Sequence, residues 1–513
     1  IIDARKCDLQ VLKSLMEDST IPKYGANLSF DYKWLKKYDI ETEYLIDVLL
    51  IERILNAGKV YFNTRGYYSL NGLALRYLNK KLDKDVRDSF LIHKGSFSSE
   101  QLEYAAQDVI TPIQIFQKFQ KKELLKEGLW NTFKLECDCI PVFANIEYNG
   151  IYLNENKWRK IYHDNVDNLL KSKTKAKEIF QDVLDITLLD EIDLNLESNP
   201  KVLYAFKKLG YNLESTGEEV LQFNTPKEIH DPLLQYRHYK KDTATYGLKY
   251  LDHINPITKR VHANFFQIGT ETGRPSSNRP NLLNIPRDNR YRSCFKAQKQ
   301  GAQIITTDFV GQELRIMTEV TQEPKWIKAF LGNKNVHIMV GTDIFEVPVE
   351  KSETKVNIAG EEIRLQDLYD ITKNINFGSA YGAGPKRILT LHLKIGVEIT
   401  MNRAKQIVNS YKKQYPVLNK ELEKIAKDTI DLGYSISIGG RKRYFSYPDR
   451  SKMDYNKFRI RLYGIEREGK NHRIQGTGAD ELKRSLIILY KKIKNAKKKN
   501  ELFIVLKIGR AHV

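Results

Sequence analysis

The chain is too long for one domain, and it contains no apolar run that could cross a membrane. It has 513 residues, whereas a single domain usually holds roughly 100–200. A membrane-spanning helix needs about 18 or more consecutive apolar residues, and no run in this sequence approaches that length. The sequence therefore predicts a multidomain protein without membrane-spanning helices.

Basic residues outnumber acidic ones, with 84 Lys and Arg against 64 Asp and Glu and a formal charge of +20. Clustered cations gain free energy by displacing counterions from a phosphate backbone, so this excess favours a polyanionic partner. An AT-rich gene would also raise the Lys content, and the charge alone leaves both explanations open. The low count of four cysteines argues against a disulfide framework and favours a reducing, intracellular compartment.

Hydrophobic periodicity divides the chain into regions of different type. Short apolar runs alternate with helical patterns over 1–120, and helical patterns dominate 121–260 and 321–430. Strand patterns occur in 261–320, above all at 303–307, and again at 434–438 before two glycines. These patterns predict an α/β region followed by an α+β region.

Two acidic residues and a tyrosine in the first region could form a hydrolytic site. Asp31 follows a short apolar stretch, and Tyr104 and Asp108 are four residues apart, so a helix would place both on one face. In that arrangement Tyr104 could orient a water molecule while Asp108 holds a metal ion. A surface aspartate beside a half-buried tyrosine is the commoner explanation of such a pair.

The order of the segments 21–31, 47–56, 68–70 and 104–108 resembles the 3′–5′ proofreading exonuclease domain of family A DNA polymerases. The resemblance implies a ribonuclease H-like fold in which Asp31 and Asp108 bind divalent metals and Tyr104 aligns the attacking water. The family also has an Asp-x-Glu pair earlier in the domain, and the 30 residues before Asp31 contain none. We therefore expect the sequence to begin inside this domain.

Asp308 follows the predicted strand 303–307, a common position for a metal ligand. Residues 308–315 resemble the first catalytic motif of family A polymerases, although Phe309 to Gly311 replace the usual Tyr-Ser-Gln. The resemblance implies that Asp308 and the carbonyl of Phe309 bind Mg²⁺, with two ions per active site. It also implies that Glu313 fills the space of a ribose 2′-hydroxyl and so favours deoxynucleotides.

Lys373, Phe377 and Tyr381 are spaced by four residues, so a helix would place them on one broad face. Such a stripe alone is more often part of a core, but residues 373–382 resemble the nucleotide-binding helix of the family. The resemblance implies that Lys373 neutralises the α-phosphate and protonates the leaving pyrophosphate, with Phe377 and Tyr381 beside the nucleotide. His337 likewise resembles the phosphate-contacting histidine of the family.

One departure concerns the triphosphate. Tyr369 stands where the family usually has an arginine. Lys373, His337 and Arg387 are therefore expected to carry the affinity for the triphosphate.

Further polar residues resemble DNA contacts of the family. Arg274, in the family-like run 272–286, is implied to lie near the primer terminus and minor groove, and Arg467, Asn471 and Gln475 are implied to contact the minor groove. Minor-groove acceptors are common to all base pairs, so contacts there test pairing geometry without reading sequence. Arg237 and Lys241 resemble the helix that grips the duplex, and a solvated basic face explains these two equally well.

The end of the sequence departs from the family. A strand is predicted at 502–506, but the expected His-Asp motif does not follow it. Residues 508–513 correspond to codons that resemble a sequencing adapter, so we expect 507–513 to be an artefactual tail.

Together these motifs predict an exonuclease domain at 1–122, truncated at its start, and a right-hand polymerase domain at 123–506. Within the latter we expect the thumb at about 150–260, the palm at about 261–320 and 431–506, and the fingers at about 321–430. The predicted function is DNA-templated DNA polymerisation with proofreading, in replication and repair. Primer-template DNA and dNTPs are the expected partners, and the chain is expected to be monomeric.

Three alternatives remain: an exonuclease whose polymerase half is inactive, a non-catalytic DNA-binding protein, and a single-subunit RNA polymerase. Glu313 and the exonuclease-like region disfavour the last. The motif departures and AT-rich codon usage favour an organellar location, in a plastid or mitochondrion of a protist, with any targeting segment outside this sequence.

Overall fold

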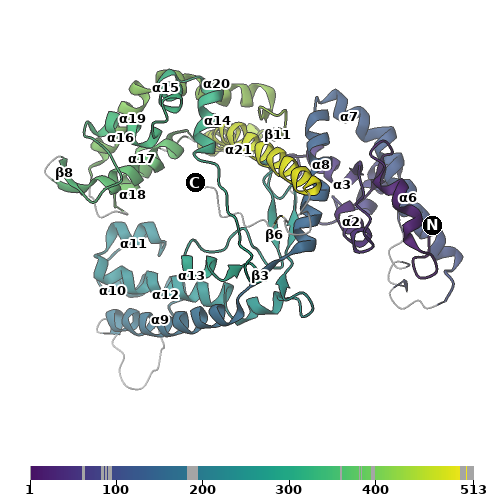
Figure 1. Ribbon diagram of the computed structural model, residues 1–513. Coiled ribbons are helices and arrows are strands. Elements are labelled where there is room, and N and C mark those ends of the chain that lie inside the picture. The colour runs from purple at the N-terminus through teal and green to yellow at the C-terminus, as the bar shows by residue number, and fades with distance from the viewer. Residues whose placement is uncertain are drawn as a thin grey trace.

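The computed structural model describes residues 2–60, 64–82, 86, 89–90, 95–181, 195–358, 361–380, 382, 384–393, 399–496 and 504 of the chain. The first part of the sequence forms one end of the molecule, and two helical arms form the other end (Figure 1). We call α9 to α12 the lower arm and α14 to α20 the upper arm, after their positions in Figure 1. In the part of the chain that is described, no helix is long and apolar enough to span a membrane.

The N-terminal part is built on two parallel strands, β1 (Lys23–Gly25) and β2 (Leu45–Asp47). Parallel neighbours require a crossover connection, and α2 (Leu28–Lys37) supplies it. Asp47 then starts α3 (Val48–Leu55) by accepting hydrogen bonds from the backbone N–H groups of Leu49 and Leu50. This arrangement confirms the α/β prediction for the first region.

The remaining described helices of this part either precede β1 or follow α3 in the sequence. A capping box of Ser98 and Gln101 begins the longest of them, α6. They are η1 (Leu9–Leu12), α1 (Lys13–Glu17), α4 (Leu70–Leu78), α6 (Ser99–Ile115), a π-helical turn (Phe116–Gln120) and α7 (Lys121–Lys126).

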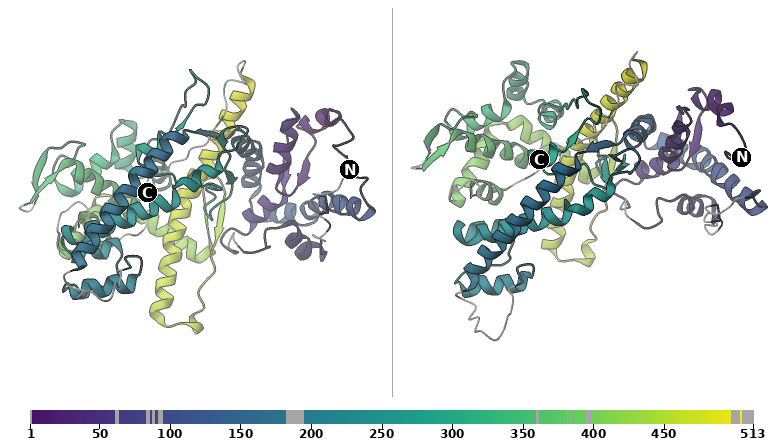
Figure 2. Two further views of the ribbon diagram at one scale, coloured as in Figure 1. Left: turned by 90° about the horizontal axis from the view of Figure 1, so that it is seen from below. Right: turned by 60° about the horizontal axis from the view of Figure 1, so that its bottom comes forward.

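Helix α8 (Trp130–Asn149) joins the N-terminal part to the rest of the molecule. It is buried along most of its length, and it contacts α2, α3 and the long helix α21 (Tyr455–Asn495). Helices α9 (Glu155–Gln181) and α21 are the longest in the described part of the chain, and their colours, blue and yellow, can be followed in both views of Figure 2.

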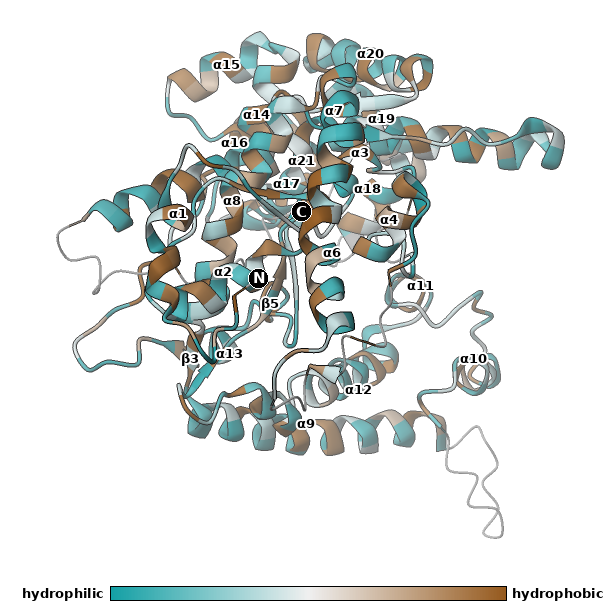
Figure 3. Ribbon diagram, turned by 90° about the vertical axis from the view of Figure 1, so that its right-hand side faces the viewer, coloured by the Kyte–Doolittle hydropathy of each residue, from teal (hydrophilic) through white to brown (hydrophobic). Residues whose placement is uncertain are grey.

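The lower arm consists of α9 (Glu155–Gln181), α10 (Asn199–Lys208), α11 (Glu218–Asn224) and α12 (Lys227–Thr245). Helices α9 and α12 pack along each other. In Figure 3 α9 alternates between hydrophilic and hydrophobic bands, as expected for a helix with one buried face. Buried side chains that include Phe180, Phe206 and Leu233 form the core of this arm.

Small antiparallel sheets lie at the base of the arms. Strand β3 (Ile151–Leu153) pairs with β4 (Arg260–Val261) and β7 (Phe295–Lys296), and β5 (Asn264–Phe266) pairs with β6 (Ser276–Asn278). The short helices η3 (Leu248–His253) and α13 (Asn289–Arg292) complete this region.

The strand predicted at 303–307 is wrong, because this segment pairs with no strand among the described residues. Ile304 packs against the core beneath it, whereas Ile305 is 82% exposed. Buried and exposed side chains therefore alternate along this segment, but it lacks the ladder of hydrogen bonds to a neighbouring strand that defines a β-strand. The strand predicted at 502–506 lies outside the described residues, apart from Ile504.

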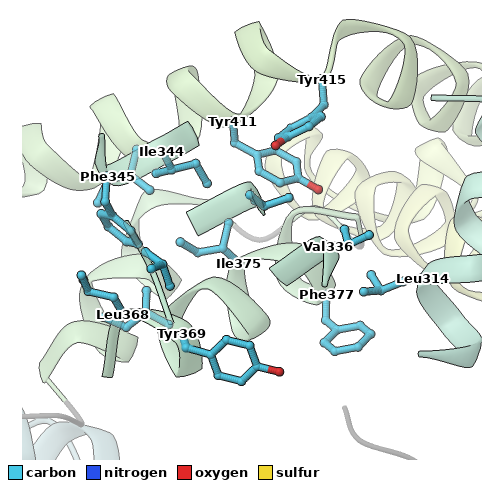
Figure 4. Packing of buried hydrophobic residues seen from close by; sticks show 14 of the residues in the cluster. Leu314, Val336, Ile344, Phe345, Leu368, Tyr369, Ile375, Phe377, Tyr411 and Tyr415 are labelled. Carbon is cyan, nitrogen blue, oxygen red and sulfur yellow. The ribbon is translucent and has the colours of Figure 1, made fainter. Parts of the chain in front are cut away.

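In its described residues the upper arm is mainly helical, and it also contains a hairpin, β8 (Lys355–Ile358) and β9 (Glu361–Arg364), that the sequence did not predict. Its core contains buried aromatic and aliphatic side chains, among them Ile375, Tyr411 and Tyr415 (Figure 4). The helices are α14 (Gln312–Thr321), α15 (Pro324–Leu331), α16 (Val336–Phe345), α17 (Leu365–Ala380), α18 (Pro385–Leu393), α19 (Met401–Gln414) and α20 (Pro416–Leu432).

The last part of the fold is a hairpin followed by α21. Strands β10 (Tyr434–Ile436) and β11 (Lys442–Tyr444) are antiparallel, which confirms the strand and turn predicted there. A short helix, η4 (Arg450–Lys452), precedes α21. At their tips, the lower and upper arms meet where α11 contacts α18, and Arg387 Nη1 lies 2.6 Å from Glu219 Oε1.

Candidate active sites

A cavity of about 530 Å³ lies between the segment 308–315 and helices α16 and α17. We call it the Asp308 cavity. The structure brings together in its lining six of the residues predicted for the nucleotide site: Asp308, Phe309, Glu313, His337, Lys373 and Phe377. Tyr381, which was also predicted there, lies outside the described residues.

Helix α17 supplies one wall of this cavity. Lys373 and Phe377 are one turn apart on it, as the spacing predicts, and Phe377 is also part of the buried core. Figure 4 shows Phe377 and Tyr369 on the same side of that core, opposite Tyr411 and Tyr415. Phe377 therefore belongs to the core and lines the cavity as well.

His337 occupies the first turn of α16, which Asn335 caps. Its ring lies between those of Tyr369 and Phe377, with centroid separations of 5.8 and 5.7 Å. Nδ1 of His337 is 2.9 Å from Nδ2 of Asn376. Burial, with the charges of Lys373 and Lys351, lowers the pKa of His337 to about 4. The imidazole is therefore neutral at pH 7.

Lys351 is a cavity residue that the sequence interpretation missed. It lines the Asp308 cavity, and its Nζ lies 4.8 Å from the ring centroid of Tyr369. Arg387, expected to help bind the triphosphate, does not line this cavity and instead pairs with Glu219 of the lower arm. Nothing in the sequence around Lys351 distinguishes it from other lysines, since it lies in a connection outside every motif.

Glu313, in the first turn of α14, is held by an arginine from a distant loop. Arg274 Nη2 lies 2.5 Å from Glu313 Oε1, and the Glu313 side chain is only 4% exposed. The structure thus brings together a residue predicted to contact DNA and the residue predicted to exclude a 2′-hydroxyl. An ion pair exposed at the surface would add little stability. A nearly buried Arg274–Glu313 pair instead fixes the geometry of both side chains.

The other predicted DNA contacts lie outside the cavity. Arg467, Asn471 and Gln475 occupy α21 at helical spacing, with Arg467 exposed and the other two partly buried. On α12, Lys241 is exposed, whereas Arg237 is partly buried and donates a hydrogen bond of 2.9 Å to the hydroxyl of Thr216. Arg237 therefore ties the lower arm together, and its contact with DNA stays a prediction.

A second cavity, of about 670 Å³, contains the residues predicted for hydrolysis. Asp31 from α2 and Tyr104 and Asp108 from α6 all line it, and we call it the Asp31 cavity. Burial raises the pKa of Asp31, and the charge of Asp108 adds to this rise although a backbone hydrogen bond opposes it. The two carboxylates are thus close enough to repel each other, and a cation would relieve that repulsion.

Asp47 also lines the Asp31 cavity, but its role in the structure is to hold backbone. Its carboxylate accepts hydrogen bonds from the N–H groups of Leu28, at 2.8 Å, and of Leu49 and Leu50. Burial raises the pKa of Asp47 to about 6 in spite of these donors.

Metal-binding groups are sparse in both cavities. Among the described residues, no three His, Cys, Asp or Glu side chains gather closely enough to hold a metal ion. The acidic residues that line the Asp308 cavity are Asp308 and Glu313, and Arg274 already binds Glu313. Asp308 and the Phe309 carbonyl thus suit an ion that keeps several waters, as Mg²⁺ does.

Comparisons with known proteins cover nearly the whole chain. The sequence profile described as DNA polymerase family A matches residues 161–508, and that of a 3′–5′ exonuclease matches residues 1–123. DNA polymerase I of Rhizobium leguminosarum is 29% identical over 505 residues, which are 93% of this chain and 45% of that protein. DNA polymerase I of Borreliella burgdorferi is 29% identical over 517 residues, which are 97% of this chain and 52% of that protein. The chain thus spans about half the length of these relatives.

A solved structure shares the fold. The POL domain of Pol1 from M. smegmatis, in complex with DNA primer-template and dNTP, aligns with a TM-score of 0.76 at 21% identity. The alignment covers 96% of this chain and 80% of that one. The fold is therefore an exonuclease domain followed by a polymerase domain, as the sequence predicts. Since the profile of the polymerase family matches more than half of the chain, the protein belongs to DNA polymerase family A.

Proposed function

We propose that the protein is a DNA-templated DNA polymerase that adds dNTPs to a primer 3′-OH, with a 3′–5′ proofreading exonuclease. The observation that carries the proposal is the Asp308 cavity, whose lining combines a carboxylate, cations and an aromatic wall. Phosphoryl transfer depends on positioning and on charge stabilisation, and this set of side chains can supply both. Membership of the family supports the same activity.

Each side chain in the cavity has a proposed task. Lys373 and Lys351 neutralise the triphosphate, and neutral His337 offers it a hydrogen bond without adding charge. Phe377 packs beside the nucleotide. Glu313, held by Arg274, occupies the space that a ribose 2′-hydroxyl needs and so selects deoxynucleotides.

Magnesium is the proposed cofactor, with two ions per active site. When bound, such ions activate the attacking oxygen and stabilise the charge on the leaving group. In the Asp308 cavity, Asp308 and the carbonyl of Phe309 would hold them. In the Asp31 cavity, Asp31 and Asp108 would be the ligands, and Tyr104 would orient the water that hydrolyses the mispaired end.

Primer-template DNA and dNTPs are the proposed partners of a monomeric chain. Arg274, Arg467, Asn471 and Gln475 would contact the minor groove of the duplex near its end. Lys241 and Arg237 would contact its backbone farther away. An organellar site of action is proposed only on the sequence departures described above.

Primer extension by the full-length protein tests the proposal. We expect Asp308→Asn to lower the extension rate by at least about 100-fold, because the variant loses a negative metal ligand. Binding of primer-template DNA, measured by fluorescence anisotropy, should stay near the wild-type value. Asp370→Asn, at an exposed position on α17, is the matched control and should extend primers normally.

Other outcomes would point to the alternatives. A wild-type protein that degrades single strands but extends no primer would be an exonuclease with an inactive polymerase half. One that binds DNA without either activity would be a DNA-binding protein. Equal extension by wild type and Asp308→Asn would remove Asp308 from the active site.

A further inference from the structure

Four charged side chains lie together in the interior, and none of them lines either cavity, although Glu136 accepts a hydrogen bond from Gln267 in the lining of the Asp31 cavity. They are Glu136 of α8, Arg441 of the β10–β11 turn, and Asp480 and Lys483 of α21, and we call them the buried charge cluster. Their side chains are between 0 and 5% exposed. Glu136 binds both cations, with Lys483 Nζ at 2.5 Å, and Asp480 lies 2.7 Å from Arg441 Nη2.

Such a cluster is expensive to bury and therefore calls for an explanation. Two cations and two carboxylates make the cluster neutral overall, but the desolvation of four charges offsets most of their mutual attraction. Well-packed apolar side chains in the same place often stabilise a protein equally well. Burial lowers the pKa of Lys483, and the carboxylate of Glu136 opposes that shift. A role in fixing geometry accounts better for the cluster than a role in stability.

Among the backbone segments that the cluster contacts is the loop of residues 269–274. Lys483 Nζ donates to the carbonyl of Gly273 at 2.8 Å. The guanidinium of Arg441 lies against the same glycine, because a Cβ at Gly273 would be 2.6 Å from Arg441 Nε. Gly273 also has a φ of +82°, which favours glycine.

Because the backbone of Gly273 is held in place, the backbone of the next residue, Arg274, is restrained as well. The backbone N–H of Arg274 donates to the Thr270 hydroxyl at 3.1 Å, and its carbonyl accepts from Gly269 at 2.9 Å. With the peptide fixed on both sides, the guanidinium reaches Glu313 in the lining of the Asp308 cavity.

We propose that Lys483 and Arg441, held in place by Glu136 and Asp480, are positioning residues that set Arg274 against Glu313. This inference rests on the proposed polymerase function, in which Arg274 and Glu313 act at the primer terminus and the incoming sugar. The cluster itself touches neither substrate. It acts through the backbone of the 269–274 loop.

A double-mutant cycle tests the proposal in the full-length protein. Lys483→Met removes the donor to Gly273 and keeps the length of the side chain, and Arg274→Ala removes the group that it positions. We expect each variant to lower kcat/KM for dNTP incorporation by about tenfold, and the double variant to be no worse than Arg274→Ala alone. Lys492→Met, at an exposed position of α21, is the matched control and should match wild type.

Two further measurements separate positioning from general damage. Selectivity for dNTP over rNTP depends on Glu313, so we expect Lys483→Met to relax it, while digestion of single-stranded DNA stays unchanged. Should Lys483→Met unfold, the paired variant Glu136→Gln/Lys483→Met keeps the cluster neutral and replaces it in the cycle. Losses that multiply in the double variant, or an equal fall in single-strand digestion, would overturn the proposal.

Crystal structures of wild type and Lys483→Met give a test that needs no activity. We expect the Gly273 carbonyl to turn and the Arg274–Glu313 contact to break in the variant, and an unchanged contact would overturn the proposal. A wild-type protein that extends no primer would instead refute the proposed function, whatever the variant structures show.

Discussion

At the scale of single residues, Lys351 adds a positive charge to the Asp308 cavity although it lies outside every motif recognised in the sequence. Its ammonium group lies over the ring of Tyr369 and lines the Asp308 cavity. A triphosphate contact made equally before and during reaction lowers KM without changing kcat. We therefore expect Lys351→Ala to raise KM for dNTP by about tenfold with kcat nearly unchanged, measured by steady-state primer extension.

The control for this prediction is Lys355→Ala. Lys355 lies on the nearby strand β8 and pairs with Glu362 instead of lining the cavity. Its removal should leave KM unchanged. If both variants have the KM of wild type, then Lys351 does not bind the triphosphate.

The sequence could not identify Lys351, although it identified most of the residues around it. Asp308, Glu313, His337 and Lys373 lie in motifs whose order and spacing are distinctive. Lys351 lies in a connection, 18 residues before Tyr369 in the sequence, and only the tertiary fold brings the two together. Replacement of the family arginine by Tyr369 predicts that charge is needed, but not which residue supplies it.

At the scale of elements, Asp47 couples the start of α3 to the start of α2. Its carboxylate accepts from Leu28 at the beginning of α2 and from Leu49 and Leu50 in the first turn of α3. Because burial raises its pKa to about 6, the folded protein keeps the proton as the pH rises from about 4, whereas the unfolded chain releases it.

This difference predicts a pH dependence of stability. The contribution of protonated Asp47 is present below about pH 4 and is lost as the pH rises to about 6, a loss of about 3 kcal/mol in the free energy of unfolding. Asp47→Asn cannot ionise, so the stability of the variant should fall less over this range. Urea unfolding of both proteins between pH 4 and 7 measures the difference, and parallel curves would contradict the prediction.

The sequence predicted well which side chains share one face of a helix. Spacings of four residues placed Tyr104 and Asp108 on α6, Lys373 and Phe377 on α17, and Arg467 to Gln475 on α21. A helix satisfies its own backbone, so local spacing is sufficient to predict which side chains share a face. The segment 303–307 shows the opposite case, because a strand requires a partner that local alternation does not reveal.

The buried charge cluster lies beyond prediction from a single sequence. Glu136 and Lys483 are 347 residues apart, and each alone reads as an ordinary surface residue of a helix. Their burial follows from the packing of α8 against α21, which no local pattern encodes.

At the scale of the whole molecule, α11 and α18 form a contact between the tips of the two arms. The Arg387–Glu219 pair is about half exposed on each side, so its stabilisation is no more than about 1 kcal/mol and weakens with salt. We expect Arg387→Glu to shorten the residence time of the protein on primed circular DNA, because like charges part the tips. Arg387→Glu/Glu219→Arg should restore it, as single-molecule dwell times can measure, and an unrestored double variant would argue against the pair.

The meeting of the arms has a topological consequence. Contacts run from α18 through α19, α20 and α21 to α8. The chain itself continues from α8 through β3 to α9, and contacts then run from α9 through α12 to α11 and back to α18. A duplex seated between the arms would be encircled, so a DNA without ends could enter or leave only while the tips are apart. The weak pair would open easily when the protein loads onto the duplex. Once the pair has closed, the protein could no longer leave the duplex sideways and would dissociate only by sliding to the nearest end.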